Sequence, residues 1–329
     1  MTRLCVLGAG SWGTALAIAL APRFASIRLW ARDAERAQSI QALRQNERYL
    51  PGFRLPENVS VSADLSKVAE EADITLIVVP AQHLRTVLRD FAPHCSDHMK
   101  LVSAAKGIEE SSLCRMSQVI AEMLPGRPIA VLSGPTFAKE IAAGEPAAVV
   151  IASEQLKFAS EVQRAFATRA LRLYASDDIA GVELGAALKN VIAIGAGICR
   201  GLGLGSNSVA ALITRGLAEI MRLADSMFMN PATLSGLAGL GDLVLTATGD
   251  LSRNRYVGMQ LGQGRSLHEI LAGMTMIAEG VGTCRAAYAL GKSRNVDLPI
   301  VEKIYEILYE QKDPRQAISE LMERPLTTE

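Results

Sequence analysis

Neither sign of charge is in excess, and cysteine is scarce. The 329 residues carry 34 Lys and Arg against 34 Asp and Glu, so the chain as a whole does not attract nucleic acid or an anionic membrane surface. A phosphate-bearing ligand must therefore be met by a local cluster of cations. The five cysteines are scattered, odd in number and without C-x-x-C spacing, which favours a reducing compartment over a disulfide framework. We expect a cytoplasmic protein without a nucleic-acid partner.

Histidines and long apolar runs are also few. There are four histidines, and the group His94, Cys95 and His98 lies in a polar loop without the further ligands that a metal site needs, so we expect no metal. The most apolar run, residues 184–198, contains Lys189 and Asn190 and falls short of the ~20 apolar residues that span a bilayer. No signal-peptide pattern precedes the first strand-like segment. We therefore expect a buried helix and no stable membrane insertion.

Short β-branched runs alternate with helical patterns in the first half of the chain. Predicted strands occupy residues 3–7, 26–31, 59–62, 74–79, 100–104, 129–132, 147–152 and 171–174. Continuous apolar runs such as "ITLIVV" are typical of strands covered on both faces of a parallel sheet. After about Asp178 these runs disappear, and the pairs Ser266 with Glu269 and Asp313 with Gln316 indicate reciprocally capped helices. We predict an α/β Rossmann-type domain with a mostly parallel sheet over residues 1–178 and an all-α domain over 179–329.

The first predicted strand is followed by the glycine triplet Gly8, Gly10 and Gly13 and then by an Ala-rich helix. These glycines permit a tight turn and a close approach of the backbone to a pyrophosphate, which the helix N-terminus stabilises. A Gly-rich turn without a ligand is the structural alternative. Because the strand, turn and helix occur in the required order, the motif predicts dinucleotide binding.

The second predicted strand ends in Ala31-Arg32-Asp33, where the adenosine ribose of a dinucleotide would lie. An acidic residue there serves the ribose hydroxyls of NAD, whereas an arginine accommodates the 2′-phosphate of NADP. Both residue types are present, so we expect NADPH to be accepted and leave its preference over NADH open. Arg32 as a solvated surface residue remains the alternative.

Lys189 lies in the apolar run and requires an explanation beyond solubility. On a helix, its neighbours three and four positions away are Gly185, Ala186, Ile192 and Ala193, so one side carries little bulk and a ligand could approach the ammonium. Burial lowers the pKa of a lysine toward values useful for proton transfer. The alternative is a lysine whose stem packs on the core while its charge reaches solvent.

Other ionisable groups lie among small residues. Lys106 in "SAAKGIE" and the pair Gly134 and Thr136 in "LSGPTFAKEI" follow predicted strands, at the sheet edge where parallel sheets bind ligands. Ser252, Arg253 and Asn254 form a donor set suited to a phosphate or carboxylate. Asp242 lies in a Gly-rich segment, where it either orients a lysine or forms a turn.

Seven motifs together resemble those of bacterial NAD(P)-dependent glycerol-3-phosphate dehydrogenases in order and spacing. They are "GAGSWGTA", "SAAKGIE", "SGPTFAKEI", "ELGAALKNVIAIGAGI", "AALITRGLAEI", "GLAGLGDLVLTATGDLSRNRYVG" and "EGVGT". The resemblance spans nearly the whole chain. It implies reversible reduction of dihydroxyacetone phosphate to sn-glycerol 3-phosphate with NADP or NAD. The product would be a precursor for phospholipid synthesis. The resemblance further implies a C-terminal domain of the 6-phosphogluconate-dehydrogenase-like type and a homodimer.

The resemblance also implies roles for residues that match the family motifs. Lys189 would be catalytic, assisted by Lys106 and Asp242. The substrate would be surrounded by Lys106, Gly134, Thr136, Lys189, Asp242, Ser252, Arg253 and Asn254. The cofactor would contact Gly8, Gly10, Ser11, Trp12, Gly13, Arg32, Lys106, Ala138, Arg253, Ile277 and Glu279.

Two other readings stay open on the residues alone. A hydroxyacid dehydrogenase of the 6-phosphogluconate type shares the domain pair and a lysine, but such enzymes typically separate the lysine and asparagine by a helical turn, whereas Lys189 and Asn190 are adjacent. A catalytically silent NAD(P)H sensor would bind nucleotide without turnover. It gives no reason for Lys106, Lys189 and Asp242 to accompany a phosphate-type donor set.

Overall fold

The computed structural model describes residues 2–326, which form two compact units. The first unit takes the chain as far as Lys106 together with Cys114–Glu183, and the second takes Gly107–Leu113 and the chain from Leu184 onward. The short segment Gly107–Leu113 groups with the second unit because Ile108 is buried in the core of that unit. No pattern in the sequence predicts that this segment joins the second unit.

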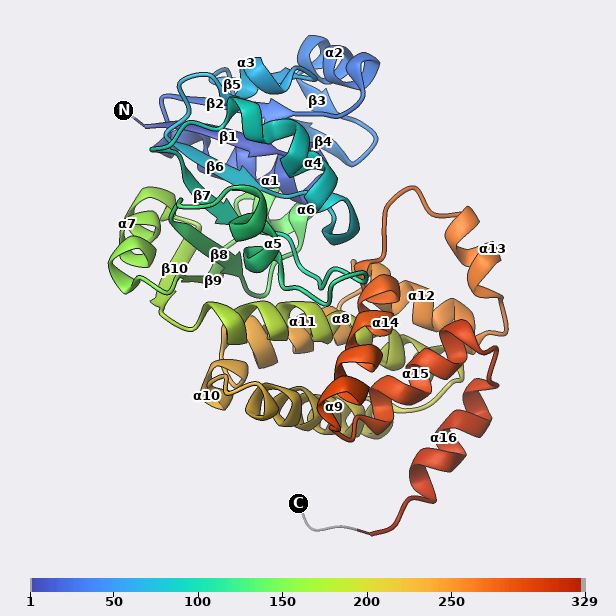
Figure 1. The fold of residues 1–329 in the computed structure, drawn as a ribbon. Helices are drawn as coiled ribbons and strands as arrows, with labels where there is room; N and C mark the ends of the chain where they lie inside the picture. Colours follow the sequence, from blue (N-terminus) through green and yellow to red (C-terminus); the bar gives the residue numbers. More distant parts are fainter. Residues whose placement is uncertain (1, 327–329) are drawn as a thin grey trace. The chain divides into compact units, whose positions relative to one another are not determined.

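An eight-stranded sheet forms the centre of the first unit (Figure 1). Its strands are β1 (Arg3–Leu7), β2 (Ser26–Trp30), β5 (Val59–Ser62), β6 (Ile74–Ile77), β7 (Lys100–Ser103), β8 (Ile129–Ser133), β9 (Ala147–Ala152) and β10 (Leu171–Ser176). Their order is β10-β9-β8-β7-β6-β1-β2-β5, and every pair is parallel except β8 with β9. The predicted strands and the mostly parallel sheet are confirmed, and the first six strands have the order typical of dinucleotide-binding domains.

Helices cover both faces of this sheet. Residues of β1 alternate between two cores, with Leu4 and Val6 in one and Cys5 and Leu7 in the other. The first core also contains side chains of α1 (Ser11–Leu20), α2 (Ala34–Leu43), α6 (Ala138–Ala143) and α7 (Leu156–Phe166). The second contains side chains of α3 (Leu65–Ala69), α4 (Leu84–Phe91) and α5 (Met116–Met123). Burial on both faces is why the strands read as continuous apolar runs.

A hairpin of β3 (Gln45–Asn46) and β4 (Leu50–Arg54) follows α2 and is absent from the sequence-based prediction. Its second strand contains Pro51 and Gly52. Both residue types are depleted in strands, so the pattern gives a turn signal instead. The hairpin pairs only with itself and not with the main sheet.

The elements of the second unit are all helical among its described residues, joined by short connections, and Gly107–Leu113 is an irregular segment. The unit comprises α8 (Ile179–Gly201), α9 (Ser206–Ser226), α10 (Pro231–Leu234), the π-helical turn η4 (Leu237–Gly241), α11 (Asp242–Thr248), α12 (Arg253–Gly262), α13 (Leu267–Ala272), α14 (Glu279–Arg294), α15 (Pro299–Tyr309) and α16 (Pro314–Met322). The reciprocal cap of Ser266 and Glu269 is confirmed. Asp313 also caps its helix, but Gln316 donates to Glu320 instead of returning to the cap, so the predicted reciprocal half is wrong.

Helix α8 is long and apolar enough to cross a membrane by length and composition alone. Its whole apolar window is nevertheless buried inside the structure. A helix that is apolar on all sides and covered by other helices is typical of the core of a soluble domain. The predicted buried helix around Lys189 is therefore confirmed.

Candidate active site

The glycine triplet forms the turn between β1 and α1. Gly8 has φ +121°, and a methyl group added at Gly13 would lie 1.9 Å from the carbonyl oxygen of Gly8, so neither position tolerates a side chain. Helix α1 begins at Ser11 with no side-chain cap and no acidic residue in its first turn. Its N-terminal N–H groups and dipole therefore fit a pyrophosphate. The buried Nε1 of Trp12 adds a donor with no partner among the described residues.

Arg32 and Asp33 lie between β2 and α2, as predicted for residues near an adenosine ribose. Asp33 is the N-cap of α2, and its Oδ1 accepts a hydrogen bond of 2.8 Å from the backbone N–H of Arg36. The guanidinium of Arg32 makes no hydrogen bond or ion pair with the described residues and is exposed. The carboxylate is thus occupied by the helix while the cation remains available to a ligand.

Lys106, Gly134 and Thr136 come together at the carboxyl ends of β7 and β8. The carbonyl oxygen of Gly134 accepts hydrogen bonds from Lys106 Nζ and from Thr136 Oγ1, both at 3.1 Å. Gly134 has φ +150°, and an added methyl group would lie 2.9 Å from the Cα of Val149. Glycine is therefore required there, and Ala138 follows as the first residue of α6.

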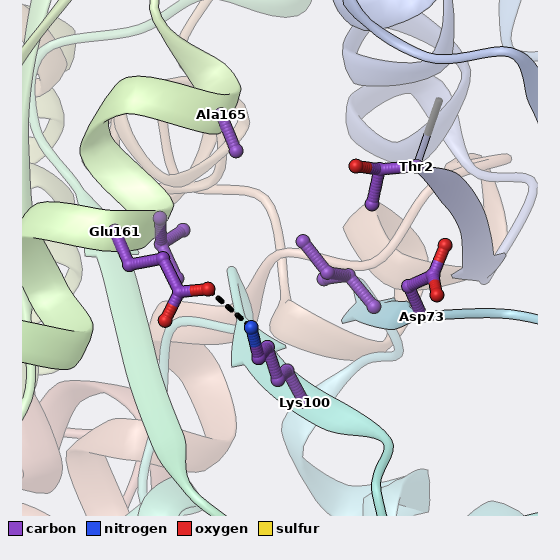
Figure 2. Close-up of a pocket in the computed structure, with 7 residues that line it drawn as sticks. Thr2, Asp73, Lys100, Glu161 and Ala165 are labelled. Atoms are coloured by element: carbon purple, nitrogen blue, oxygen red, sulfur yellow. Dashed lines mark hydrogen bonds and ion pairs between the residues drawn. The ribbon is translucent and has the colours of Figure 1, made fainter.

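A small crevice lies at the other edge of the sheet (Figure 2), where Thr2, Asp73 and Lys100 stand at the amino ends of strands beside Glu161 of α7. An ion pair between Lys100 and Glu161 occupies its wall. Parallel sheets bind ligands at the carboxyl ends of their strands, and its volume of ≈ 80 Å³ is far below that of a usual ligand pocket. None of the predicted site residues lines it.

Lys189 is 5% exposed, and its ammonium forms an ion pair with the fully buried carboxylate of Asp242. Lys189 Nζ also donates a hydrogen bond of 2.8 Å to Thr246 Oγ1, and that hydroxyl donates to the backbone carbonyl of Asp242 at 2.6 Å. Asp242 begins α11 directly after the π-helical turn η4 instead of lying in an irregular turn. The polar residues in the apolar helix are thus satisfied internally, as buried charges must be.

The small-residue face beside Lys189 is filled in part by protein. A methyl group added at Gly185 would lie 3.0 Å from the carbonyl oxygen of Ala238 and 3.2 Å from the Cα of Gly239. The expectation that this glycine leaves space for a ligand is therefore wrong. Its small size instead lets η4 pack on α8 and brings Asp242 to the lysine.

Arg253 and Ser252 lie at the N-terminus of α12. Ser252 is the N-cap, and its hydroxyl accepts a hydrogen bond from the backbone N–H of Arg255. The Arg253 guanidinium makes no hydrogen bond or short ion pair with the described residues. Burial lowers the pKa of Arg253, and the nearby carboxylate of Glu279 opposes that shift. A half-buried guanidinium with unused donors is a strong site for an anion.

Asn254 links three helices. Its Nδ2 donates to Asn190 Oδ1 at 2.8 Å, and its Oδ1 accepts from the backbone N–H of Gly280 at 2.9 Å. These bonds fix the orientation of the amide and leave one N–H of Asn254 for another acceptor. Gly280 follows Glu279 at the start of α14, and Ile277 just before it is 47% exposed.

Glycines set the close crossing of α8 and α12. A methyl group added at Gly258 would lie 1.9 Å from the carbonyl oxygen of Ile194, and one at Gly197 would lie 2.0 Å from that of Arg255. Gly201 and Gly262 repeat the contact one turn further along each helix. The two backbones thus touch, which places the N-terminus of α12 beside the part of α8 that carries Asn190.

Two polar partners at the site, Thr246 and Asn190, are not among the site residues predicted from the sequence. Thr246 lies one helical turn after Asp242, so the four-residue spacing was a usable signal. Asn190 is adjacent to Lys189 and shares its anomaly as a polar residue in an apolar run. Its partner Asn254 is 64 positions away, and no sequence period indicates that pairing.

Comparison with known proteins gives concordant matches along the chain. The family models for the N-terminus and the C-terminus of NAD-dependent glycerol-3-phosphate dehydrogenase match residues 3–159 and 178–319. A glycerol-3-phosphate dehydrogenase (NAD(P)+) of Syntrophotalea carbinolica is 51% identical over 98% of each chain, and that of Koribacter versatilis is 50% identical over 100% of this chain and 99% of its own.

Solved structures agree with these sequence matches. The crystal structure of a glycerol-3-phosphate dehydrogenase from Coxiella burnetii superposes with a TM-score of 0.95 at 39% identity, covering 98% of this chain and 99% of the other. A D-mandelate dehydrogenase bound to NADH gives a TM-score of 0.63 at 14% identity, with 94% and 98% covered. The second match indicates a common fold alone.

Proposed function

The chain belongs to the NAD-dependent glycerol-3-phosphate dehydrogenase family, and from that premise we propose that it interconverts dihydroxyacetone phosphate and sn-glycerol 3-phosphate with NADP or NAD. The observation that carries the proposal is the buried ammonium of Lys189, held by Asp242 and Thr246 in the unit that also contains Arg253, whose guanidinium makes no hydrogen bond with the described residues. A proton donor and a phosphate anchor are what a phosphorylated ketone requires.

Lys189 acts in this proposal as the proton donor. A dinucleotide held at the glycine turn would supply hydride chemistry for reduction at the C2 carbonyl carbon. Lys189 gives a proton to the developing alkoxide oxygen, and in the oxidation direction it takes the proton from the hydroxyl. Asp242 and Thr246 hold the ammonium in place, so little reorganisation accompanies the transfer.

The remaining residues of the proposed substrate site bind and orient the substrate. Arg253 and Asn254, with Ser252, hold the phosphate remote from the reacting carbon, so that binding energy serves positioning. Lys106 adds positive charge where negative charge develops, and its bond to the Gly134 carbonyl fixes the ammonium. Thr136 supplies a hydroxyl beside the same carbonyl.

The dinucleotide would bind at the glycine turn of the first unit. Gly8, Gly10 and Gly13 shape the pyrophosphate turn, with Ser11 and Trp12 at the start of α1. The further contacts proposed from the family motifs are Arg32, Lys106, Ala138, Arg253, Ile277 and Glu279. The donors and the glycine cradle fit a dinucleotide, and the chemistry it brings is hydride transfer.

The cellular setting of the proposal follows the family. A cytoplasmic location suits the five free thiols, and a homodimer is proposed by analogy. The product would enter phospholipid synthesis.

The test is spectrophotometric oxidation of NADPH and NADH at 340 nm with dihydroxyacetone phosphate, beside a panel of hydroxyacids in the reverse direction. We expect turnover with dihydroxyacetone phosphate and none with the hydroxyacids. Lys189→Ala should lower kcat by orders of magnitude while NADPH binding stays within about twofold, because the lysine acts on the proton and not on the nucleotide. Near-normal turnover of this variant would exclude the assigned role, and turnover of hydroxyacids instead would exclude the substrate.

A further inference from the structure

The segment Gly107–Leu113 directly follows Lys106 and belongs to the second unit. Ile108 is buried in the core of that unit, and Leu113 packs against the same core. The backbone N–H of Leu113 donates to the carbonyl oxygen of Glu109 at 2.9 Å, which closes the segment into a turn. The backbone that leaves Lys106 is therefore anchored by apolar contacts near both ends of a short turn.

A charged contact fixes the middle of this turn to α14. Glu110 Oε2 accepts a hydrogen bond of 2.9 Å from Arg285 Nη1, and the two side chains form an ion pair. The guanidinium carbon of Arg285 also lies 4.3 Å from the ring centroid of Tyr309, the last residue of α15. An arginine that pairs with a carboxylate and also stacks on a ring has few alternative positions. The contact therefore fixes the orientation of the turn as well as its place.

The ring of Tyr309 is itself held by two helices. Its Oη donates a hydrogen bond of 2.6 Å to the carbonyl oxygen of Val281, in the first turn of α14. The ring centroids of Tyr309 and Tyr305 are 5.1 Å apart, and Tyr305 stacks on Tyr288 of α14 with centroids 4.1 Å apart. The surface on which Arg285 rests is thus a row of packed aromatic rings.

Helix α14 also contacts the proposed phosphate-binding residues. The backbone N–H of Gly280, in its first turn, donates to Asn254 Oδ1 at 2.9 Å, and Asn254 follows Arg253 in the chain. The helix therefore links the turn after Lys106 to the residues assigned to the substrate phosphate. All of these contacts lie within the second unit.

The ion pair is too exposed to be explained as a source of stability. The side chains of Arg285 and Glu110 are 54% and 28% exposed, and exposed ion pairs contribute little to the free energy of folding. Position matters far more for catalysis, because a displacement of about 1 Å can lower a rate about a hundredfold. A weak but directional contact beside a reacting group therefore affects the rate more than the stability.

We propose that Arg285 and Glu110 are positioning residues for Lys106, which fix the turn after it so that its ammonium stays where negative charge develops on the substrate. The proposal rests on the proposed function, which assigns Lys106 to the reaction. The ammonium of Lys106 is held by the carbonyl oxygen of Gly134, and the ion pair holds the backbone that follows. Arg285 acts through Glu110 and the turn, without touching the substrate.

The test compares steady-state reduction of dihydroxyacetone phosphate by Glu110→Gln, Arg285→Gln and the double variant. Each single variant should lower kcat about tenfold and leave KM within about twofold, because a misplaced Lys106 weakens an interaction made in the transition state. The double variant should lose no more than either single variant, since both changes remove the same contact. Arg285→Lys keeps the positive charge and should recover most of the rate.

Lys292→Gln is the matched control. Lys292 lies on the same helix, pairs with Glu302 at 2.9 Å and lies 5.1 Å from the ring centroid of Tyr288, so it makes the same kinds of contact without reaching the turn. Its kcat should equal that of the wild type. Amide exchange of residues 107–113, measured without ligands, should become about tenfold faster in Arg285→Gln and stay unchanged in Lys292→Gln.

An equal fall in kcat for Lys292→Gln would overturn the proposal, as would unchanged kcat in both single variants or losses that multiply in the double variant. A lower kcat without faster exchange in residues 107–113 would also overturn it, because the turn would then still be fixed. Exchange needs no turnover, so faster exchange in Arg285→Gln supports the anchoring even if the wild type does not reduce dihydroxyacetone phosphate. That lack of turnover would count against the proposed function alone.

Discussion

At the scale of single residues, the hydroxyl of Thr246 both accepts from Lys189 and donates to the backbone of Asp242. Thr246→Val keeps the shape of the side chain but removes both bonds. We expect kcat to fall about 10- to 100-fold, the usual cost of a lost bond to a charged group, while the Kd for NADPH is unchanged. Thr246→Ser should recover most of the activity. An equal fall in the serine variant would assign the loss to packing.

Arg253 makes a separate prediction at the same scale. Its guanidinium is half-buried and makes no hydrogen bond with the described residues. Arg253→Ala should raise KM for dihydroxyacetone phosphate steeply, by about 100-fold or more, because a charged bidentate contact is lost. The slow rate with unphosphorylated dihydroxyacetone should hardly change. If both substrates lose rate equally, Arg253 does not bind the phosphate.

At the scale of helices, the crossing of α8 and α12 depends on backbone contact. Gly258→Ala would place a methyl group 1.9 Å from the carbonyl oxygen of Ile194, so the helices must separate. We expect a loss of a few kcal/mol in the free energy of unfolding and a raised KM for substrate, because α12 carries Arg253. Gly205→Ala is the control, since no atom lies within 4 Å of its added methyl. Chemical denaturation of both variants measures the change in the free energy of unfolding.

A carboxylate from another helix accepts hydrogen bonds from the N-terminus of α15. Glu219 of α9 is 1% exposed and accepts hydrogen bonds from the backbone N–H groups of Ile300 at 2.6 Å and Val301 at 3.1 Å. Burial raises the pKa of Glu219 to about 7 in spite of these bonds. The folded state therefore holds a proton that the unfolded chain releases between about pH 4.5 and 7.

It follows that Glu219 stabilises the fold most at low pH and that this contribution declines as pH rises toward 7. The difference in unfolding free energy between wild type and Glu219→Gln should change across that window by on the order of 3 kcal/mol. Denaturant titrations at pH 5, 6, 7 and 8 measure it. A constant difference across the series would mean that the carboxyl does not titrate there.

At the scale of the whole molecule, stability should depend on the dinucleotide. Ligand that binds only the folded state adds about 2.7 kcal/mol at 100 times its Kd. We expect NADP+ to raise Tm and to slow amide exchange in the turn of Gly8, Gly10 and Gly13, where the N-terminus of α1 has no side-chain cap. No shift in Tm at saturating NADP+ would contradict the assignment of this turn. 5′-AMP serves as the weaker reference ligand.

The sequence by itself determined the eight main strands, the change to helices after Asp178 and the dinucleotide turn, because hydrophobic period, glycine spacing and caps are local signals. It also predicted the family, which the comparisons confirm. The roles of Lys189, Asp242 and Arg253 stay predictions, although their unusual settings were visible as charges among apolar or small residues.

Only the tertiary structure decided which of these groups meet. The ion pair of Lys189 with Asp242 joins positions 53 apart, and the hydrogen bond from Asn254 to Asn190 joins positions 64 apart. Glycines at the helix crossing make such contacts possible, but the sequence position of a glycine does not indicate which segment will pack against it. The hairpin that carries Tyr49 was not predicted because its local signal is misleading. Pro51 and Gly52 indicate a turn, but strand pairing within the fold overrides that preference.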